Sequence, residues 1–288
     1  MRRGGADVRV PQVGGPAAVR PVQVIFRAGP GRRPRPDLDS PAVPVSTIAR
    51  RVQDHTRARG VLPVLADCAS WGLRWAAGRP GAGRPSPATF THEGVERPYF
   101  RHPYHYTWLN ERAVEVPLAE TVLDEVVLAG HDPARVLEVG NVLGHYRPVT
   151  HTVVDKYEQA PGVRNVDVVD LDPATTGPFD LVLALSTLEH VGFDEEPKDP
   201  GKPAAAVAVL TSLLAPGGRL FCTFPVGYNP ALDEALRTDR LGFTRRTALR
   251  RTGRDNRWEQ VPLDDVWGVA YDWLLYTAHA VVVAELQR

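Results

Sequence analysis

Short apolar runs separated by segments of helical period fill the chain from residue 118 onward, and this alternation constrains the fold more than any other feature. The run 179–186, FDLVLALS, has the continuous apolar character of a strand buried on both faces of a parallel sheet. Strands are predicted at 134–140, 151–155, 166–171, 179–186, 218–225 and 279–287, helices at 118–130, 203–218 and 230–240, and a hairpin at 248–261. Strands that alternate with helices predict an α/β fold with a mostly parallel sheet, right-handed crossovers and helices on both faces.

Composition divides the chain into three predicted regions. Residues 1–45 are dense in proline, glycine and arginine without a sustained period, which predicts a disordered basic leader. Residues 46–117 are predicted to hold N-terminal helices, a hairpin turning at Glu93 and Gly94, and an aromatic lid segment. Residues 118–288 are predicted to form the α/β domain.

The formal net charge is zero, but the charge is unevenly distributed along the chain. Residues 1–60 carry twelve arginines and four acidic residues, which gives +8, so residues 61–288 carry −8. An acidic folded part disfavours binding to a phosphate backbone. We therefore expect a small molecule rather than nucleic acid as the partner. A basic tail can nevertheless bind nucleic acid, and that alternative stays open.

The apolar and cysteine content set further expectations. No apolar run reaches the ~18 residues that a membrane-spanning helix needs, so we expect no membrane association. The two cysteines, Cys68 and Cys222, lie far apart, which suggests neither a disulfide scaffold nor a zinc site. We expect a cytoplasmic protein with no bound metal.

The segment RVLEVGNVLGHY, residues 135–146, begins as a buried strand and ends as a glycine turn. The dinucleotide-binding pattern G-x-G-x-x-G fails here because Val142 stands at its second glycine position, where a side chain blocks the approach of a pyrophosphate. The pattern E-x-G-x-x-x-G fits instead, through Glu138, Gly140 and Gly144.

This loop and three later segments resemble the motifs of class I S-adenosylmethionine-dependent methyltransferases. The later segments are THTVVDKYE, GPFDLVLALSTLEHVGF and LLAPGGRLFCTFP. The resemblance covers about 118–225 and extends loosely to the end of the chain. It implies a Rossmann-like sheet with an antiparallel last strand, S-adenosylmethionine as cofactor, and relatives in bacterial glycan or natural-product pathways.

The resemblance also implies a set of cofactor-binding residues. They are Glu138, Gly140, Asn141, Gly144, Asp155, Asp167, Val168 and Ser186. Asp155 ends the second predicted strand, where an acid can accept hydrogen bonds from ribose hydroxyls, or alternatively cap a helix. Asp167, with Asp170 as its rival, is expected to contact adenine. The six residues 145–150 replace the longer helix that the family has after the glycine loop.

The expected chemistry centres on the residues after the predicted strand 179–186. His190 lies beside the expected position of the methyl group and suits a general base, although a packing role is equally compatible with its position. Glu189 is expected to orient the cofactor or the histidine. The acceptor is expected to contact the aromatic segment 99–112 and the PVGYNP segment. The acceptor residues are Tyr104, Tyr106, Trp108, Arg112, Tyr228 and Asn229.

These patterns predict a methyltransferase acting on a small-molecule acceptor, such as a hydroxyl, amine or carbon of a sugar or secondary metabolite. Two alternatives stay open. One is a nucleic-acid methyltransferase that uses the basic N-terminal tail. The other is a protein of this fold that binds the cofactor without transferring methyl groups.

Overall fold

A computed structural model describes residues 45–288, with side chains from residue 48, and these residues belong to one compact unit. The predicted leader, except for its last residue, lies outside the described residues. The predicted division between residues 117 and 118 falls inside helix α3 (Arg112–Leu128). No helix in the described part of the chain is long and apolar enough to cross a membrane.

The centre of the structure is a mixed sheet of eight strands. In spatial order the strands are β5 (Val163–Arg164), β4 (Thr152–Val154), β3 (Val136–Val139), β6 (Phe179–Leu185), β7 (Leu214–Pro225), β10 (Ala280–Gln287), β8 (Arg245–Arg251) and β9 (Trp258–Val261). The strands from β5 to β7 are parallel, whereas β10, β8 and β9 join by antiparallel pairing. The predicted fold class, including the antiparallel last strand, is confirmed.

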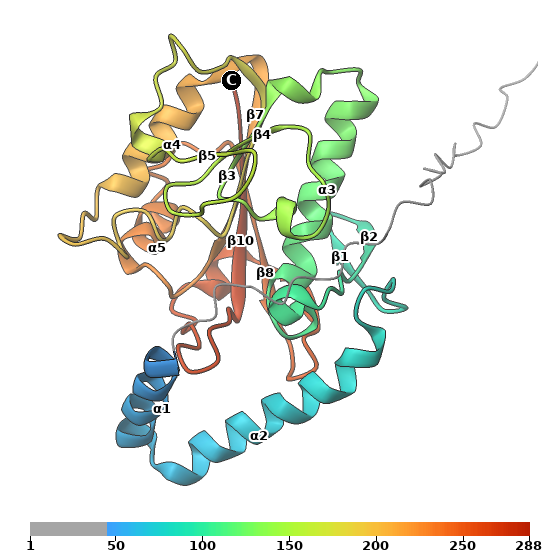
Figure 1. Ribbon diagram of the computed structural model, residues 1–288, viewed down its shortest axis with the longest axis vertical. Helices are drawn as coiled ribbons and strands as arrows, with labels where there is room; N and C mark the ends of the chain where they lie inside the picture. Colours follow the sequence, from blue (N-terminus) through green and yellow to red (C-terminus); the bar gives the residue numbers. More distant parts are fainter. Residues whose placement is uncertain (1–44) are drawn as a thin grey trace, which may run out of the picture. The chain divides into compact units, whose positions relative to one another are not determined.

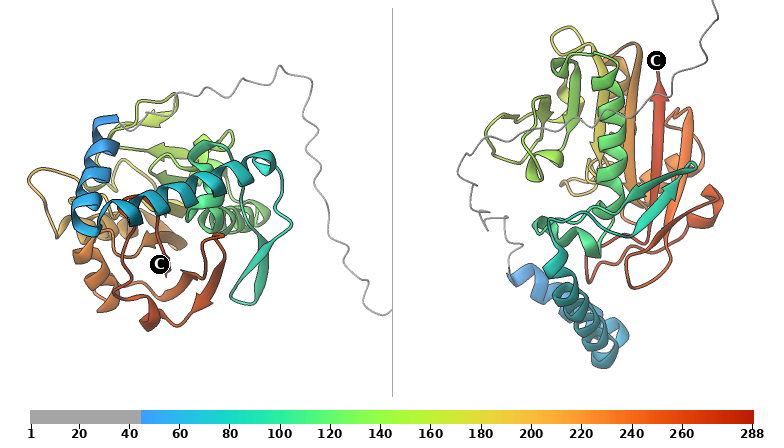
Figure 2. Two further views of the ribbon diagram at one scale, coloured as in Figure 1. Left: turned by 90° about the horizontal axis from the view of Figure 1, so that it is seen from below. Right: turned by 90° about the vertical axis from the view of Figure 1, so that its right-hand side faces the viewer.

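Helices cover both faces of this sheet (Figure 1). Helix α3 and the hairpin formed by β1 (Thr89–His92) and β2 (Val95–Pro98) lie on one face, and α4 (Lys202–Ser212) and α5 (Pro230–Arg237) lie on the other. Helices α1 (Val45–Arg59) and α2 (Val61–Gly78) lie beyond the carboxyl ends of the parallel strands (Figure 2).

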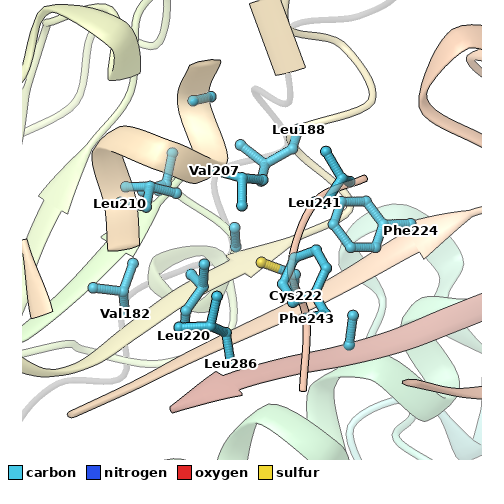
Figure 3. Close-up of a cluster of buried hydrophobic side chains, with 14 of the residues drawn as sticks. Val182, Leu188, Val207, Leu210, Leu220, Cys222, Phe224, Leu241, Phe243 and Leu286 are labelled. Carbon is cyan, nitrogen blue, oxygen red and sulfur yellow. The ribbon is translucent and has the colours of Figure 1, made fainter. Parts of the chain in front are cut away.

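Strand β6 shows why the two faces need two layers of helices. Its side chains alternate between the two hydrophobic clusters: Val182 packs on the α4 side, while Leu181 and Leu183 pack on the α3 side. Figure 3 shows the first cluster, in which Val207 and Leu210 of α4 lie over the sheet. A strand buried in this way must be apolar along its buried part, which explains the continuous apolar run from Leu181 to Leu185.

Helix α3 begins at Arg112, six residues before the predicted start. Pro117 lies inside this helix and has no N–H to donate to the carbonyl of Ala113. The backbone N–H of Phe100 donates to that carbonyl instead, at 2.9 Å. The helix therefore runs through its proline because a neighbouring segment satisfies the freed acceptor.

Two predicted elements are corrected. The strand predicted at 166–171 is wrong: the strand that pairs with β4 is Val163–Arg164, and Val168–Asp170 form a 3₁₀ turn. The Asp167 carboxylate accepts from the N–H of Val169 and starts this turn, which overrides the strand preference of the valines. The helix predicted to reach Gly218 ends at Ser212, because Leu214 already pairs with Phe179 of β6.

We expect Leu210→Ala to destabilise the protein by about 2–5 kcal/mol, because the Leu210 side chain of α4 is fully buried against the sheet and its truncation leaves a cavity. Urea denaturation measures the loss. Leu128→Ala is the matched control, since Leu128 is 83% exposed and should change stability little. Equal effects of the two substitutions would contradict this account of the core.

Candidate active site at the carboxyl ends of the parallel strands

The strand order changes direction between β3 and β6. From β3 the chain adds β4 and β5 on one side, and it then crosses back to place β6 on the other side. The loops that leave Val139 and Leu185 therefore diverge at the carboxyl edge of the sheet. In open α/β sheets this switch point is where ligands bind.

Glu138 organises the loop that follows β3. Its side chain is fully buried, and its Oε1 accepts hydrogen bonds from the backbone N–H groups of Val142 (2.9 Å) and Leu143 (2.7 Å). Its Oε2 accepts from Nε2 of the buried His151, at 2.7 Å. The first residue of the E-x-G-x-x-x-G pattern thus binds the protein's own loop.

The two glycines of this loop are required by close packing. Gly140 has φ +82°, and a Cβ at this position would clash with the side chain of Thr187. A Cβ at Gly144 would clash with the side-chain oxygen of Asn141. Gly140 therefore brings the β3 loop into direct contact with the β6 loop, whereas Gly144 lets the β3 loop pack against its own Asn141 side chain.

Asp155, at the end of β4, faces this loop. Its Oδ1 accepts hydrogen bonds from the N–H groups of Tyr157 and Glu158, both at 2.8 Å, and so caps the following turn. Its Oδ2 accepts one long hydrogen bond, 3.4 Å, from the N–H of Asn141. The Asn141 amide donates in turn to Glu158 at 2.6 Å, and Nε2 of His145 lies 3.1 Å from the same carboxylate. Asp155 therefore caps a turn through Oδ1, while its Oδ2 accepts only one long hydrogen bond.

Asp167 belongs to an ionic network. Its Oδ2 lies 2.6 Å from Nζ of Lys202 and 2.8 Å from Nζ of Lys156, and both lysines also contact Glu195. Although partial burial raises the pKa of the Asp167 carboxyl, the two lysines lower it more. Val168, the next residue, is buried in the core. The carboxylate that we expected to contact adenine is thus already paired with two lysines.

Arg112 and Glu115 meet the end of β6. The Arg112 guanidinium donates to Glu115 Oε2 and to the carbonyl of Leu185, each at 2.9 Å, and the hydroxyl of Ser186 donates to Glu115 Oε1. Ser186 has φ +40°, which costs backbone energy in a residue other than glycine, and its N–H donates to Thr223 of β7. Burial lowers the pKa of Arg112, but Glu115 and the neighbouring acidic groups Tyr146, Glu111 and Glu189 together raise it more.

Glu189 and Glu111 add two further carboxylates beside Arg112. Glu189 is 1% exposed, its Oε2 has no hydrogen-bond partner within residues 45–288, and burial raises its pKa to about 7. Glu111 is half-buried, and burial together with Glu115 raises its pKa. Glu115 contacts the Arg112 guanidinium, and Glu111 and Glu189 lie near enough to raise its pKa, so that these three carboxylates carry excess negative charge when ionised.

His190 lies between Glu189 and an aromatic group. Its Nδ1 is 2.6 Å from Oδ2 of Asp194, and its Nε2 is 3.6 Å from Oε1 of Glu189. Burial lowers the pKa of His190, but Asp194 and Glu189 raise it more, so it lies above the usual value. The Tyr228 hydroxyl donates to Asp194 at 2.7 Å, and its ring packs against His190.

The other residues predicted for the acceptor lie in three different places. The ring of Tyr104 stacks on His145, beside the glycine loop, whereas Tyr106 packs against Trp71 and Trp75 of α2 and against Trp108. Asn229 accepts from two N–H groups at the start of α5 and donates to the carbonyl of Glu189 at 3.0 Å. Asn229 thus caps a helix and fixes the neighbour of His190.

The sequence reasoning missed several members of this site. They are Glu111, Glu115, Asp194, Tyr271, Trp273 and Tyr276. Two signals point to them in retrospect: acids at positions i and i+4 around an arginine in an otherwise apolar helix, and the aromatic cluster YDWLLY shortly before the last strand. Within the described residues, no group of three or more His, Cys, Asp or Glu side chains is placed to hold a metal ion.

Comparison with known proteins finds no matching family model and no matching curated protein. Three solved structures illustrate what the chain resembles, and all three are methyltransferases. The first is the N-methyltransferase NodS of Bradyrhizobium japonicum WM9 with S-adenosylhomocysteine, which is 14% identical over 59% of this chain and 86% of that chain, with a TM-score of 0.34. The second is a SAM-dependent methyltransferase of Archaeoglobus fulgidus, which is 13% identical over 59% of this chain and 93% of that chain, with a TM-score of 0.36. The third is the amino pentose methyltransferase CalS10 of Micromonospora echinaspora with bound SAM, which is 26% identical over 46% of this chain and 58% of that chain, with a TM-score of 0.31.

The raised pKa of Glu189 predicts a pH dependence of stability. A carboxyl whose pKa rises from 4.5 to about 7 on folding stabilises the folded protein fully below pH 4.5, and this contribution is lost as the pH rises to about 7. The Glu189→Gln variant lacks this titration. Its stability relative to wild type should therefore increase between pH 4.5 and 7, as measured by urea denaturation at several pH values. A constant difference over this range would contradict the assignment.

Proposed function

We propose that this protein is an S-adenosylmethionine-dependent methyltransferase that acts on a small-molecule acceptor. The observation that carries the proposal is the group of three carboxylates around Arg112 at the switch point of the sheet. Methyl transfer uses a sulfonium cofactor, and a cation placed beside these carboxylates offsets their excess negative charge. The sequence motifs point to the same edge of the sheet.

The residues of the site fit such a cofactor unevenly. At the ribose end, Asp155 keeps an oxygen that accepts only one long hydrogen bond, so it can accept from a ribose hydroxyl. At the adenine end, Asp167 is engaged by Lys156 and Lys202, so an adenine amino group would have to share this carboxylate with two lysines. When bound, the cofactor would supply the activated methyl group.

The protein's own contribution to the chemistry lies in His190 and its neighbours. Asp194 holds Nδ1 of His190, which leaves Nε2 as the nitrogen that can take a proton from a hydroxyl or amine acceptor. The rings of Tyr228, Tyr271 and Tyr276 are suited to line an apolar acceptor site beside it. We assign His190 as the base, Glu189 as the group that orients it, and a sugar or secondary metabolite as the acceptor.

The first test compares S-adenosylmethionine with S-adenosylhomocysteine, which lacks the sulfonium charge. Between pH 5.5 and 7.5 Glu189 becomes ionised, so the affinity for the cationic ligand should rise relative to the neutral one, by about tenfold, or about 1.4 kcal/mol. Isothermal calorimetry measures both affinities. In the Glu189→Gln variant this pH-dependent gain should disappear; its persistence would show that Glu189 does not sense the sulfonium.

The second test concerns Asp155. Asp155→Ala should weaken binding of S-adenosylhomocysteine by about 1.5–3 kcal/mol, the range for hydrogen bonds to a charged group. Asp132→Ala is the matched control, because Asp132 also caps a turn but does so at the start of β3, at the opposite edge of the sheet. Wild-type affinity in a folded Asp155→Ala protein would rule out the ribose assignment.

A further inference from the structure

A pocket of about 410 Å³ lies beside the candidate active site and is lined mainly by polar residues. It is formed by α2, the turn of the β8–β9 hairpin and the segment before β10. Its lining includes Arg59, Arg74, Arg251, Arg254, Asp67 and Asp272. Because β10 and β8 run antiparallel to each other, the end of β8 and the start of β10 lie at one edge of the sheet, the edge that carries the candidate active site.

The positive charge of this pocket is only partly compensated. Asp67 forms an ion pair with Arg59 at 3.0 Å, and Asp272 accepts hydrogen bonds from two backbone N–H groups of its own turn. Within residues 48–288, Arg74, Arg251 and Arg254 form no ion pair with any carboxylate. Three guanidinium groups without a paired acid thus line one cavity.

Two of these arginines are held in place by backbone carbonyls. Arg74 donates from Nη1 to the carbonyl of Arg254 at 2.6 Å, and Arg251 donates from Nη2 to the carbonyl of Leu109 at 3.2 Å. The Nε of Arg251 is buried and has no hydrogen-bond partner among the described residues. Burial and the proximity of Arg74 lower the pKa of Arg251 to about 10. The protein keeps these cations close together at an electrostatic cost.

We propose that this pocket binds an oxyanion of the phosphate class carried by the small-molecule acceptor. Guanidinium groups match the geometry of phosphate oxygens, and an anion offsets the mutual repulsion of the three arginines. Thr277 connects the two sites, because it lines the pocket and its hydroxyl donates to Glu111 at 3.2 Å. A phosphate bound here would hold the rest of the acceptor toward the three carboxylates near Arg112. The anion site stands by itself, whereas its link to the acceptor rests on the proposed function.

Calorimetric titration of the full chain with inorganic pyrophosphate tests the site. The wild type should bind one equivalent, and Arg251→Gln and Arg254→Gln should each weaken binding at least tenfold. Arg254 is exposed, so its substitution leaves the core intact if Arg251→Gln fails to fold. Arg84→Gln, an exposed arginine outside the pocket, is the control and should bind as the wild type does. No saturable binding, or an equal loss in the control, would overturn the proposal.

Two further measurements separate this proposal from its alternatives. S-adenosylhomocysteine should bind the pocket variants and the wild type equally; if it binds none of them while pyrophosphate binds the wild type, the proposed function fails and the anion site remains. A labelled single-stranded oligonucleotide should show no anisotropy change that depends on Arg254. If it binds and Arg254→Gln abolishes this binding, the anion belongs to nucleic acid and the small-molecule assignment is overturned.

Discussion

The buried carboxylate of Glu138 is the interaction on which the candidate site depends. Glu138 lies one residue before the end of the central strand β3, and its carboxylate accepts hydrogen bonds from two N–H groups of the following loop and from the ring of His151 just before β4. A short loop without a regular helix has few backbone hydrogen bonds of its own, so the hydrogen bonds to Glu138 satisfy N–H groups that a helix would otherwise pair. The glycine loop consequently has a defined shape before any ligand arrives, which lowers the cost of ordering it on binding.

Charge separates the carboxyl edge of the sheet into two neighbouring environments. Around Arg112, carboxylates are in excess, and the pKa values of Glu111 and Glu189 are raised. Around Arg251, guanidinium groups are in excess, and the buried Nε of Arg251 has no hydrogen-bond partner in the described part of the chain. Thr277 lies between the two groups. Such a pair of environments suits a cationic group at one end of a bound assembly and an anionic group at the other.

Much of the fold was predictable because its signals are local. The continuous apolar run of β6 and the hairpin of β8 and β9 follow from side-chain pattern and turn chemistry alone. The wrong prediction of a strand at 166–171 has a different cause. The Asp167 carboxylate accepts a hydrogen bond from the N–H of Val169 and starts a turn where the valines favour a strand. In the candidate site, Glu138 and Gly140 were predicted from the E-x-G-x-x-x-G pattern and Asp155 from its position at the end of a strand, and the structure brings the three into one loop region. Asp194 and Tyr271 were missed because only packing brings them to His190 and Tyr228.

The sequence by itself determined the α/β class, the parallel strands and the presence of a glycine loop, since each depends on periodicity or on steric limits within a few residues. Only the tertiary structure decided which groups face one another. It placed two lysines on Asp167, three carboxylates near Arg112, and around one pocket three arginines that form no ion pair with the residues the structure describes. These groups come from segments up to about 180 residues apart, as the hydrogen bond from Arg74 to Arg254 shows. Electrostatic interaction depends on distance in space, and periodicity along the chain carries no information about it.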